Sequence, residues 1–378
     1  MHQHRTNTSL WGDIDIPRMP VLESDIDADI CVIGLGGSGL AGVDEALVLG
    51  QSVVGIDAGL IANGAAGKNG GLLLAGLADP YHTVVDRIGN ARAREIYAMT
   101  EREIERMRKE TVDCVRETGS LRIEASDAGL ADCRMHMSAL QNEGFSVEWY
   151  EGPEGKGLLL PNDAAFHPVK HCRQKVEQVL GGGARLFENT PAMAIESGKI
   201  VTPIAVIRCK HIIAAIDGRL DLLFPDLRSE VTPYRLQMAA TEKSPIRFPI
   251  PMYWDDGYNY LQQLSDGRIA VGGCRDEHVG AESTYSSDPT EPVQQSIERL
   301  LRELGVDAEI THRWAATVSY SKDGLPIARE LMQNVIAVGA YNGTGNLVGR
   351  ILGRAAVHAA VRGDWEMLKL FADKACKD

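Results

Sequence analysis

Hydrophobic and polar positions follow their clearest pattern near the start of the chain, after a polar leading segment. An apolar, β-branched run over residues 30–33 predicts a buried parallel strand. Residues 40–47 then place apolar side chains at helical spacing, and residues 53–56 form a second β-branched run. The order strand, helix, strand is that of a parallel βαβ unit.

Glycines at G-x-G-x-x-G spacing separate this first strand from the helix. Gly34 permits the tight turn, Gly36 lets the backbone approach a pyrophosphate, and Gly39 allows close packing of helix on strand. The phosphates would then lie at the positive N-terminus of the helix, near Gly37 and Ser38. Such a motif also occurs in ordinary turns, but its place between a strand and a helix favours a dinucleotide site.

An acid ends the second strand. Asp57 lies about 20 residues after the glycines, where a carboxylate accepts hydrogen bonds from a ribose, and Ala58 follows it. A 2′-phosphate would be repelled at Asp57. The site therefore favours a cofactor without that group.

A second glycine-rich loop directly after the acid favours FAD over NAD. An NAD-binding fold would continue here into an ordinary crossover helix, whereas a second close backbone approach suits a long, extended cofactor. The loop contains Gly64, Gly67, Lys68, Asn69, Gly70 and Gly71.

These blocks resemble the D-amino-acid-oxidase-like superfamily of FAD oxidoreductases, most of all its γ-glutamylputrescine oxidase, glycine oxidase and sarcosine oxidase branch. In that branch a loop of the form A-S-G-R-N-G-G lies against the flavin, and residues 65–71 of this chain read A-A-G-K-N-G-G. Lys68 replaces the arginine, and Asp57 replaces the more usual glutamate. Both replacements keep the charge.

The resemblance implies an α/β fold, α+β overall, of the glutathione-reductase-2-like type. A Rossmann-like FAD-binding domain is interleaved with a substrate (cap) domain built on an antiparallel sheet. The expected divisions are an N-terminal arm at 1–27, a discontinuous FAD-binding domain at 28–80, 152–225 and 310–370, and a substrate domain at 81–151 and 226–309.

The remaining periodicity predicts further elements. Apolar side chains at helical spacing predict amphipathic helices over 91–118, ending at Gly119, and over 127–142 and 287–304. The pattern over 233–274 is that of antiparallel strands, with a turn at Asp266-Gly267.

The resemblance implies further backbone contacts with the cofactor. Residues 210–218 resemble a family segment that ends in A-T-G or A-T-N, and residues 321–327 and 339–345 resemble the blocks T-x-D-G-x-P-x-I-G and G-Y-S-G-H-G. A helix that begins at 344–345 would direct its positive end toward the flavin N1–C2=O region. The residues added to the cofactor site are Ala192, Ala215, Gly218, Asn342, Gly343, Thr344 and Gly345.

In the family, the antiparallel sheet forms the wall that faces the substrate. Tyr260 and Tyr341 are our first candidates for the substrate pocket, followed by Trp254 and Tyr258. Core packing is an equally good interpretation of Trp254 and Tyr258. No catalytic acid or base is assigned, because an amine that binds unprotonated needs none.

Two absences bear on the substrate. Family members that act on α-amino acids hold the substrate carboxylate with arginines that correspond to Val318 and Gly343 here, and neither residue can form that ion pair. Arg235, Arg313 or Arg350 would have to substitute. This favours an amine that carries no carboxylate next to its reacting carbon.

Two further departures bear on the flavin. Residues 314–322 lack the cysteine through which sarcosine oxidase relatives attach flavin, so we expect FAD to bind non-covalently. The oxygen-activating lysine of that branch corresponds approximately to Ala270, which leaves oxidase and dehydrogenase chemistry open.

The resulting hypothesis is oxidation of a C–N bond in a small amine or amino acid, by hydride transfer to flavin N5 and hydrolysis of the imine, with O2 or another molecule as electron acceptor. One alternative is a 2-hydroxy-acid or polyol-phosphate dehydrogenase, for which His278 or His312 would supply the base. Another is a non-catalytic FAD-binding subunit of a larger complex.

Composition limits the partners of this 378-residue chain. Its net charge of −13 argues against nucleic acid or an anionic membrane, and no apolar run is long enough to span a bilayer. The seven cysteines are scattered without a C-x-x-C pair, and the early H-x-H pair suits no specific metal site. We expect a cytoplasmic protein with reduced thiols and no metal, and a homo-oligomer remains open.

Overall fold

The computed structural model describes residues 5–371 as two compact units. Unit 1 comprises residues up to Asp13, Lys68–Pro168 and Arg235–Ala316, and unit 2 comprises Ile14–Gly67, Val169–Tyr234 and Thr317 onward. The early H-x-H pair, His2 and His4, and the last cysteine, Cys376, lie outside the described residues.

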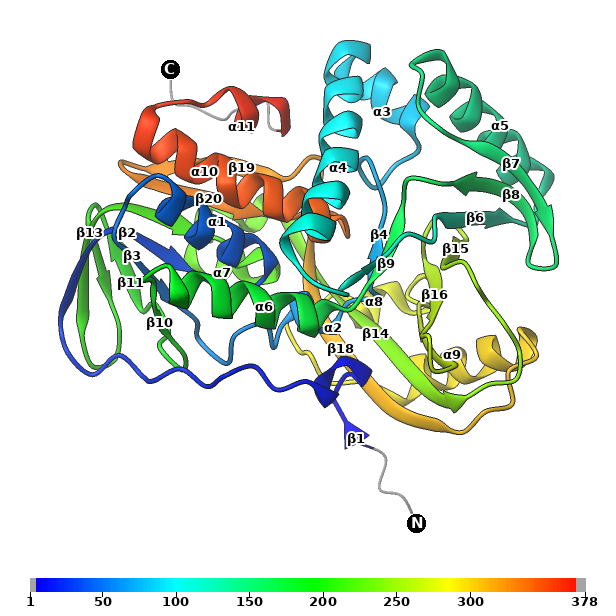
Figure 1. The fold of residues 1–378 in the computed structure, drawn as a ribbon, viewed down its shortest axis with the longest axis horizontal. Helices are drawn as coiled ribbons and strands as arrows, with labels where there is room; N and C mark the ends of the chain where they lie inside the picture. The colour runs from blue at the N-terminus through cyan, green and yellow to red at the C-terminus, as the bar shows by residue number, and fades with distance from the viewer. Residues whose placement is uncertain (1–4, 372–378) are drawn as a thin grey trace. The chain divides into compact units, whose positions relative to one another are not determined.

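A parallel sheet organises unit 2. Its strands are β10 (Arg185–Phe187), β3 (Val53–Ile56), β2 (Ile26–Ile33), β13 (Val206–Ala214) and β20 (Val335–Gly339), each paired in parallel with the next. The chain builds outward from β2 through β3 to β10, and then returns to the other side of β2 as β13 (Figure 1). The order therefore reverses between β2 and β13, where doubly wound sheets bind their ligands.

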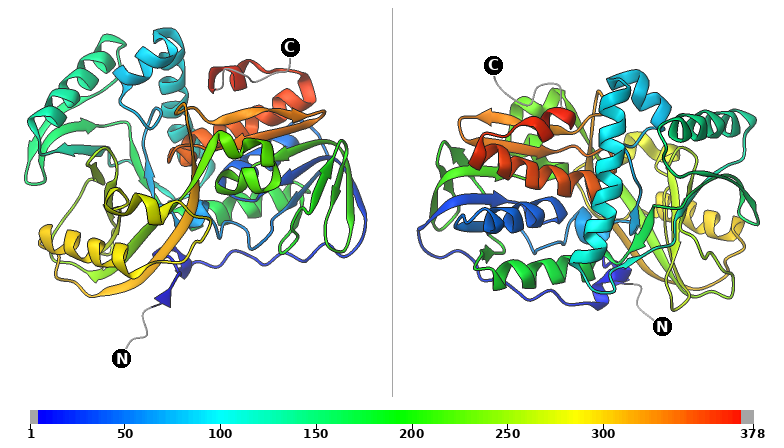
Figure 2. Two further views of the ribbon diagram at one scale, coloured as in Figure 1. Left: turned by 180° about the vertical axis from the view of Figure 1, so that it is seen from behind. Right: turned by 45° about the horizontal axis from the view of Figure 1, so that its top comes forward.

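Three helices pack around this sheet. The helix α1 (Gly37–Val48) follows β2, and α10 (Arg350–Arg362) lies beside it, as both figures of the whole chain show (Figures 1 and 2). The third, α6 (Pro168–Gly181), leads into β10. Small residues allow the close contact of α1 with α10, because a Cβ at Gly353 would lie 2.1 Å from the Ser38 carbonyl oxygen.

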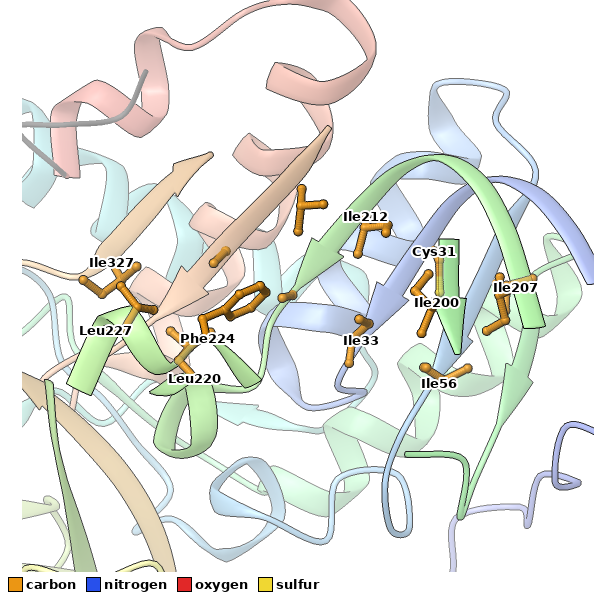
Figure 3. Packing of buried hydrophobic residues seen from close by; sticks show 14 of the residues in the cluster. Cys31, Ile33, Ile56, Ile200, Ile207, Ile212, Leu220, Phe224, Leu227 and Ile327 are labelled. Carbon is orange, nitrogen blue, oxygen red and sulfur yellow. The ribbon is translucent and has the colours of Figure 1, made fainter. Parts of the chain in front are cut away.

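The remaining elements of unit 2 are short. They are α2 (Ala65–Lys68), β11 (Ala194–Glu196), β12 (Lys199–Val201), η2 (Asp217–Arg219), α7 (Leu220–Leu223), η3 (Pro225–Ser229), β19 (Ile327–Met332), the π-helical turn η5 (Gly345–Gly349) and α11 (Glu366–Phe371). On one side of the sheet, Phe224 and Leu227 pack with strand residues such as Ile33 and Ile212 in one apolar cluster (Figure 3). Burial of this cluster stabilises the sheet.

Unit 1 is built on a mostly antiparallel sheet. Its order is β1 (Arg5–Thr6), β18 (Ile310–Ser321), β14 (Val231–Lys243), β17 (Arg268–Gly272), β16 (Asn259–Gln263), β15 (Met252–Trp254), β6 (Ser120–Glu124), β8 (Gly155–Leu160) and β7 (Glu148–Gly152). A small sheet, β4 (Leu72–Leu73), β9 (Ala164–Phe166) and β5 (Val115–Arg116), accompanies it. The expected antiparallel pattern over 233–274 is confirmed by β14 to β17.

The helices of unit 1 are η1 (Leu10–Asp13), α3 (Tyr81–Ile88), α4 (Asn90–Glu110), α5 (Asp127–Asn142), η4 (Asp276–His278), α8 (Val279–Glu282) and α9 (Glu291–Glu303). The expected helix over 127–142 is confirmed, and α9 confirms most of the one at 287–304. The helix expected over 91–118 is shorter in the structure, where α4 spans Asn90–Glu110. It ends at Glu110 because Thr111 turns extended, Val112 is exposed, and Val115 pairs with Phe166 in the small sheet.

The two faces of the large sheet differ in what covers them. On one face, Leu261 and Val271 pack with Val293 and Ile297 of α9 in a single apolar cluster. Because side chains alternate along a strand, Tyr260 and Gln262 point to the opposite face. On this opposite face, Tyr260 and Gln262 contact the loop at 68–71.

The compact units divide the chain near, but not at, the expected domain boundaries. Residues up to Asp13 pack in unit 1, and the divisions fall after Gly67, Pro168, Tyr234 and Ala316. Within the expected N-terminal arm, Leu10 and Trp11 are almost fully buried. The assignment of the expected domains to FAD and substrate stays a prediction.

Candidate functional site

The turn after β2 lies where the order of the parallel sheet reverses. Gly34 has a φ of +91°, and a Cβ there would lie 2.5 Å from the carbonyl oxygen of Ala215 at the end of β13. A Cβ on Gly39 would lie 1.8 Å from the Gly34 carbonyl oxygen. The glycines thus meet steric requirements that no other residue meets, and the Gly34 position allows the Ala215 backbone to lie against the turn.

The first turn of α1 has the features that favour phosphate binding in dinucleotide folds. Gly36 precedes the helix in an extended conformation, and no side chain caps the helix start. Gly37 and Ser38 open the helix, so their backbone N–H groups lack partners within it. Free N–H groups and a positive helix end favour a bound anion.

Asp57 is buried at the end of β3. Its carboxylate accepts hydrogen bonds from the backbone N–H groups of Leu35, at 2.8 Å, and Gly59, at 2.9 Å. Burial raises its pKa, while those two hydrogen bonds oppose the rise and nearby Glu188 adds to it. Asp57 therefore fixes the glycine turn through Leu35 and its own following loop through Gly59. Ala58 lies between Asp57 and Gly59.

Glu188 is a second acid of this region that the sequence analysis missed. It follows β10, it is 1 % exposed, and it accepts hydrogen bonds from the N–H groups of Ile61 and Met19. The signal was available, since a lone acid after the third parallel strand occupies the position that Asp57 occupies after the second. Ala192, the residue expected beside adenine, packs against the apolar cluster of the same sheet.

The C-terminal glycine-rich loop contacts the start of α1. The hydroxyl of Tyr341 donates a hydrogen bond of 2.8 Å to Ser38 Oγ, and burial raises the pKa of Tyr341 strongly. The Tyr341 ring packs against Gly345 and Gly349, where a Cβ would lie 3.0 and 3.2 Å from it. This places Tyr341 in the packing of the glycine turn, and its role in a substrate pocket stays a prediction.

The other residues of that loop are tightly ordered. Asn342 has a φ of +55° and accepts the Ser321 N–H at 2.8 Å, while Gly343 has a φ of +90°. Thr344 Oγ1 donates to the Tyr341 carbonyl at 2.7 Å and precedes the π-helical turn. The expected helix start at 344–345 is thus confirmed, although its first turn is π rather than α.

Asp217 joins this loop to the end of β13. Its carboxylate accepts the Tyr341 N–H at 3.2 Å, and burial raises the pKa of Asp217 to about 6. The neighbouring Gly218 has no room for a side chain, because a Cβ would lie 2.7 Å from the Thr317 carbonyl oxygen. The approach of these backbone segments explains why the sequence has glycine there.

Buried positive charge accompanies the same region. Arg350, at the start of α10, is 2 % exposed, and its Cγ lies 4.0 Å from where a Cβ on Gly37 would be. Burial, Arg350 and Lys175 together lower the pKa of His171 well below its usual value. Lys175 pairs with Asp44 at 2.6 Å. From the sequence, Arg350 is a candidate only as a substrate anchor.

In unit 1, the second glycine-rich loop is held by its carbonyl groups. Trp314 Nε1 donates to the Lys68 carbonyl at 2.8 Å, and Trp11 Nε1 donates to the Asn69 carbonyl at 2.9 Å. Gln262 Nε2 donates to the carbonyls of Gly70 and Gly71, at 2.8 and 3.0 Å. Four successive carbonyl groups are therefore fixed by side chains from three distant segments.

Gln262 is itself fixed by a second residue. Arg116 donates from Nη2 to Gln262 Oε1 and to the Gln263 carbonyl, each at 2.9 Å. Gly71 has a φ of +71°, and a Cβ there would lie 2.6 Å from the Phe166 carbonyl oxygen, so only glycine fits. Gly67, which precedes the loop in unit 2, is equally confined, by the Ala62 carbonyl at 2.1 Å.

The aromatic candidates lie on different faces of the antiparallel sheet. Tyr260 contacts Gly70, where a Cβ would lie 2.9 Å from its ring, and Tyr253 pairs with Tyr260 across the strands on the same face. Trp254 packs instead against the cluster that α9 covers, and Tyr258 stacks on Arg275 at 4.9 Å. Tyr253 was missed by the sequence analysis, although its alternation with Trp254 was readable.

Two of the substitute arginines are already engaged. Arg235 forms a buried ion pair of 2.7 Å with Glu282, which is 1 % exposed. Arg313 donates to Gln294 at 3.0 Å and forms an ion pair with Glu298 on α9. Neither guanidinium is available to hold a substrate carboxylate without losing its acid.

Residues 29–359 match the family described as FAD dependent oxidoreductase (DAO). This chain belongs to the FAD dependent oxidoreductase family. The expected family, the cofactor FAD and the assignment as an oxidoreductase are thereby confirmed.

Two relatives are each 25 % identical to this chain over most of its length. The probable oxidoreductase OrdL of Rhizobium meliloti is 25 % identical, over 94 % of this chain and 89 % of its own. The γ-glutamylputrescine oxidoreductase of Escherichia coli is 25 % identical, over 93 % and 88 %.

Solved structures show the same fold. Glycine oxidase from Geobacillus kaustophilus superposes with a TM-score of 0.73 at 16 % identity, over 89 % of this chain and 95 % of that one. L-amino acid deaminase from Proteus myxofaciens gives 0.74 at 14 % identity, over 96 % and 95 %. The expected mixed α/β fold is confirmed.

The residues of unit 2 fit the nucleotide part of FAD. The cradle at Gly34 and Gly36, the uncapped start of α1 and the nearby Arg350 together suit a pyrophosphate. Asp57 keeps acceptor capacity beside them, because a carboxylate accepts about four hydrogen bonds. Contact of each named residue with FAD stays a prediction.

Three further findings concern the described residues 5–371. None of their helices has the length and apolar character needed to cross a bilayer. They contain no cluster of three or more histidine, cysteine or acidic side chains arranged around a metal position. Their six cysteines form no disulfide, and five of them are buried.

Proposed function

We propose that this oxidoreductase oxidises the C–N bond of a small amine whose reacting carbon carries no carboxylate. The observation that carries the proposal is the state of the arginines: Arg235 and Arg313 are committed to Glu282 and Glu298. The positions at which an arginine was expected for a carboxylate hold Val318 and Gly343. A substrate carboxylate would therefore lack a bidentate partner at any of these four positions.

The loop Lys68–Gly71 is proposed to lie against the flavin ring, with FAD bound non-covalently. Its carbonyl groups are turned toward Trp314, Trp11 and Gln262. Within residues 5–371, no group accepts a hydrogen bond from the Gly70 N–H, so that donor is left for a ligand. Residues 314–322 offer no cysteine for covalent attachment.

Bound FAD supplies the two-electron oxidation, and the protein orients the substrate and excludes water. Tyr260 is the proposed substrate contact, because it lies on the sheet face that carries the loop and touches Gly70. Tyr253, on the same face, is its proposed companion. His278, a candidate base for a hydroxy-acid substrate, instead bonds to Ser296 on α9, which covers the other face.

Anaerobic stopped-flow reduction of the FAD-loaded enzyme tests the proposal. A panel of primary and secondary amines, matched α-amino acids and hydroxy acids is mixed with the enzyme, and bleaching of the flavin band is followed. We expect reduction by amines at least tenfold faster than by the amino acid of the same side chain. Preferred reduction by α-amino acids or by hydroxy acids would overturn the proposal.

A further inference from the structure

The segment that precedes the dinucleotide motif reaches the second glycine-rich loop. Trp11, which is 1 % exposed, donates its indole N–H to the Asn69 carbonyl and packs edge-on against the ring of His167 at 5.2 Å. The segment is anchored by β1, which pairs in parallel with His312 and Arg313 of β18. It is thus part of the packing around the loop.

Asn7 connects the same segment to the charged residue of the loop. Its Oδ1 accepts hydrogen bonds from Lys68 Nζ at 3.1 Å and from the Ala315 N–H at 3.3 Å. Its own N–H donates to the Arg313 carbonyl at 2.7 Å. Asn7 adopts a φ of +60°, which asparagine tolerates better than most residues.

Lys68 has an unusual environment for a lysine. Its ammonium group hydrogen-bonds to a neutral amide oxygen, that of Asn7. Burial lowers the pKa of Lys68, and the charge of Asp288, whose carboxylate accepts a 3.4 Å hydrogen bond from Asn7 Nδ2, opposes that effect. The hydrogen bond to Asn7 favours the protonated form.

We propose that residues 7–11 are a positioning element of the active site, in which Trp11 fixes the Asn69 carbonyl and Asn7 holds the Lys68 ammonium. The inference rests on the proposed function, because it takes the loop to lie against the flavin. Trp11 and Asn7 then act through the loop, and touch neither substrate nor cofactor. A cation fixed near the flavin would stabilise its reduced, negatively charged form.

Trp11→Phe tests the fixed carbonyl. The variant keeps an aromatic ring and loses the indole donor. Trp149→Phe is the control, because Trp149 lies on the edge strand β7 and stacks on Arg134. We expect Trp11→Phe to slow flavin reduction by the best amine at least fivefold and to shift the flavin absorption band, with FAD still bound. Reduction rate and spectrum equal to those of Trp149→Phe would overturn this part.

Asn7→Gly and Asn7→Asp test the held ammonium. Both residues tolerate the positive φ, so backbone strain is not introduced. Glycine removes the acceptor and lowers the pKa of Lys68, whereas aspartate places a carboxylate against Nζ and raises it. We expect the pH profile of the flavin reduction potential to move to lower pH in Asn7→Gly and to higher pH in Asn7→Asp.

The potential also separates this inference from the proposed function. It is measured by dye-coupled reduction of bound FAD and needs no amine. We expect Asn7→Gly to disfavour the reduced form about tenfold at neutral pH, which is about 30 mV for a two-electron couple. Unchanged potentials and superimposable profiles would overturn the inference, whereas failure of all amines with shifted potentials would overturn only the proposed substrate.

Discussion

The hydroxyl of Tyr341 hydrogen-bonds to Ser38 Oγ at 2.8 Å, and so joins the C-terminal glycine-rich loop to the first turn of α1. Both side chains are buried, at 6 % exposure each. The two ends of the chain's family signature, more than 300 residues apart, therefore position one another. This contact lies at the helix start that suits the pyrophosphate.

Tyr341→Phe should weaken both stability and FAD binding. Removing the hydroxyl leaves Ser38 Oγ without its donor, at a cost of about 1 kcal/mol. We expect a several-fold weaker Kd for FAD, measured by fluorescence titration of apoprotein, and a lower Tm. A double-mutant cycle with Ser38→Ala should show coupling, and additive effects would contradict a direct contact.

Gly34→Ala should abolish FAD binding. The added Cβ would lie 2.5 Å from the Ala215 carbonyl oxygen, a backbone atom that cannot move alone, and the φ of +91° adds strain. Gly50→Ala is the matched control, because Gly50 has a φ of +71° and no atom within 4 Å of the added carbon. The control should lose about 1 kcal/mol of stability and retain FAD. Equal FAD content in the two purified variants would refute the steric argument.

Asp163→Asn should change the pH dependence of stability. The Asp163 carboxylate accepts hydrogen bonds from Ser120 Oγ at 2.6 Å and the Ala75 N–H at 2.8 Å, and burial raises its pKa to about 7. The folded protein therefore holds a proton that the unfolded chain has released, so stability falls as the pH rises from about 4 to about 7.

The neutral amide removes this loss. Relative to the wild type, Asp163→Asn should gain up to roughly 4 kcal/mol between pH 4 and pH 8, measured by urea unfolding. Asp307→Asn, at an exposed carboxylate, is the control. A difference between wild type and Asp163→Asn that does not change with pH would contradict the assignment.

Arg235→Met should destabilise the protein without changing its substrate preference. The substitution leaves Glu282 buried and unpaired, which costs about 3–5 kcal/mol. The ratio of kcat/KM for an amine to that for its α-amino acid should stay within about twofold, since Arg235 is not a substrate anchor. The double variant Arg235→Met, Glu282→Leu should recover stability. A selective loss of amino-acid turnover would show that Arg235 binds carboxylates.

The sequence by itself determined the parallel βαβ start, the second glycine-rich loop and the C-terminal block. Each rests on local rules: the period of apolar residues, and backbone positions such as Gly34 and Gly71 that admit only glycine. Such rules act over a few residues, so the spacing of the residues in the sequence is enough to recognise them. They led to the family, the fold class and FAD.

Only the tertiary structure decided which side chains surround those motifs. The contacts of Trp11 and Trp314 with the loop at 68–69 join segments 58 and 246 residues apart, and nothing local marks either tryptophan as a donor. The engagement of Arg235 by Glu282 likewise depends on how α8 packs on β14. Partners chosen by packing over such separations leave no periodicity in the sequence, because burial and charge pairing are satisfied in three dimensions.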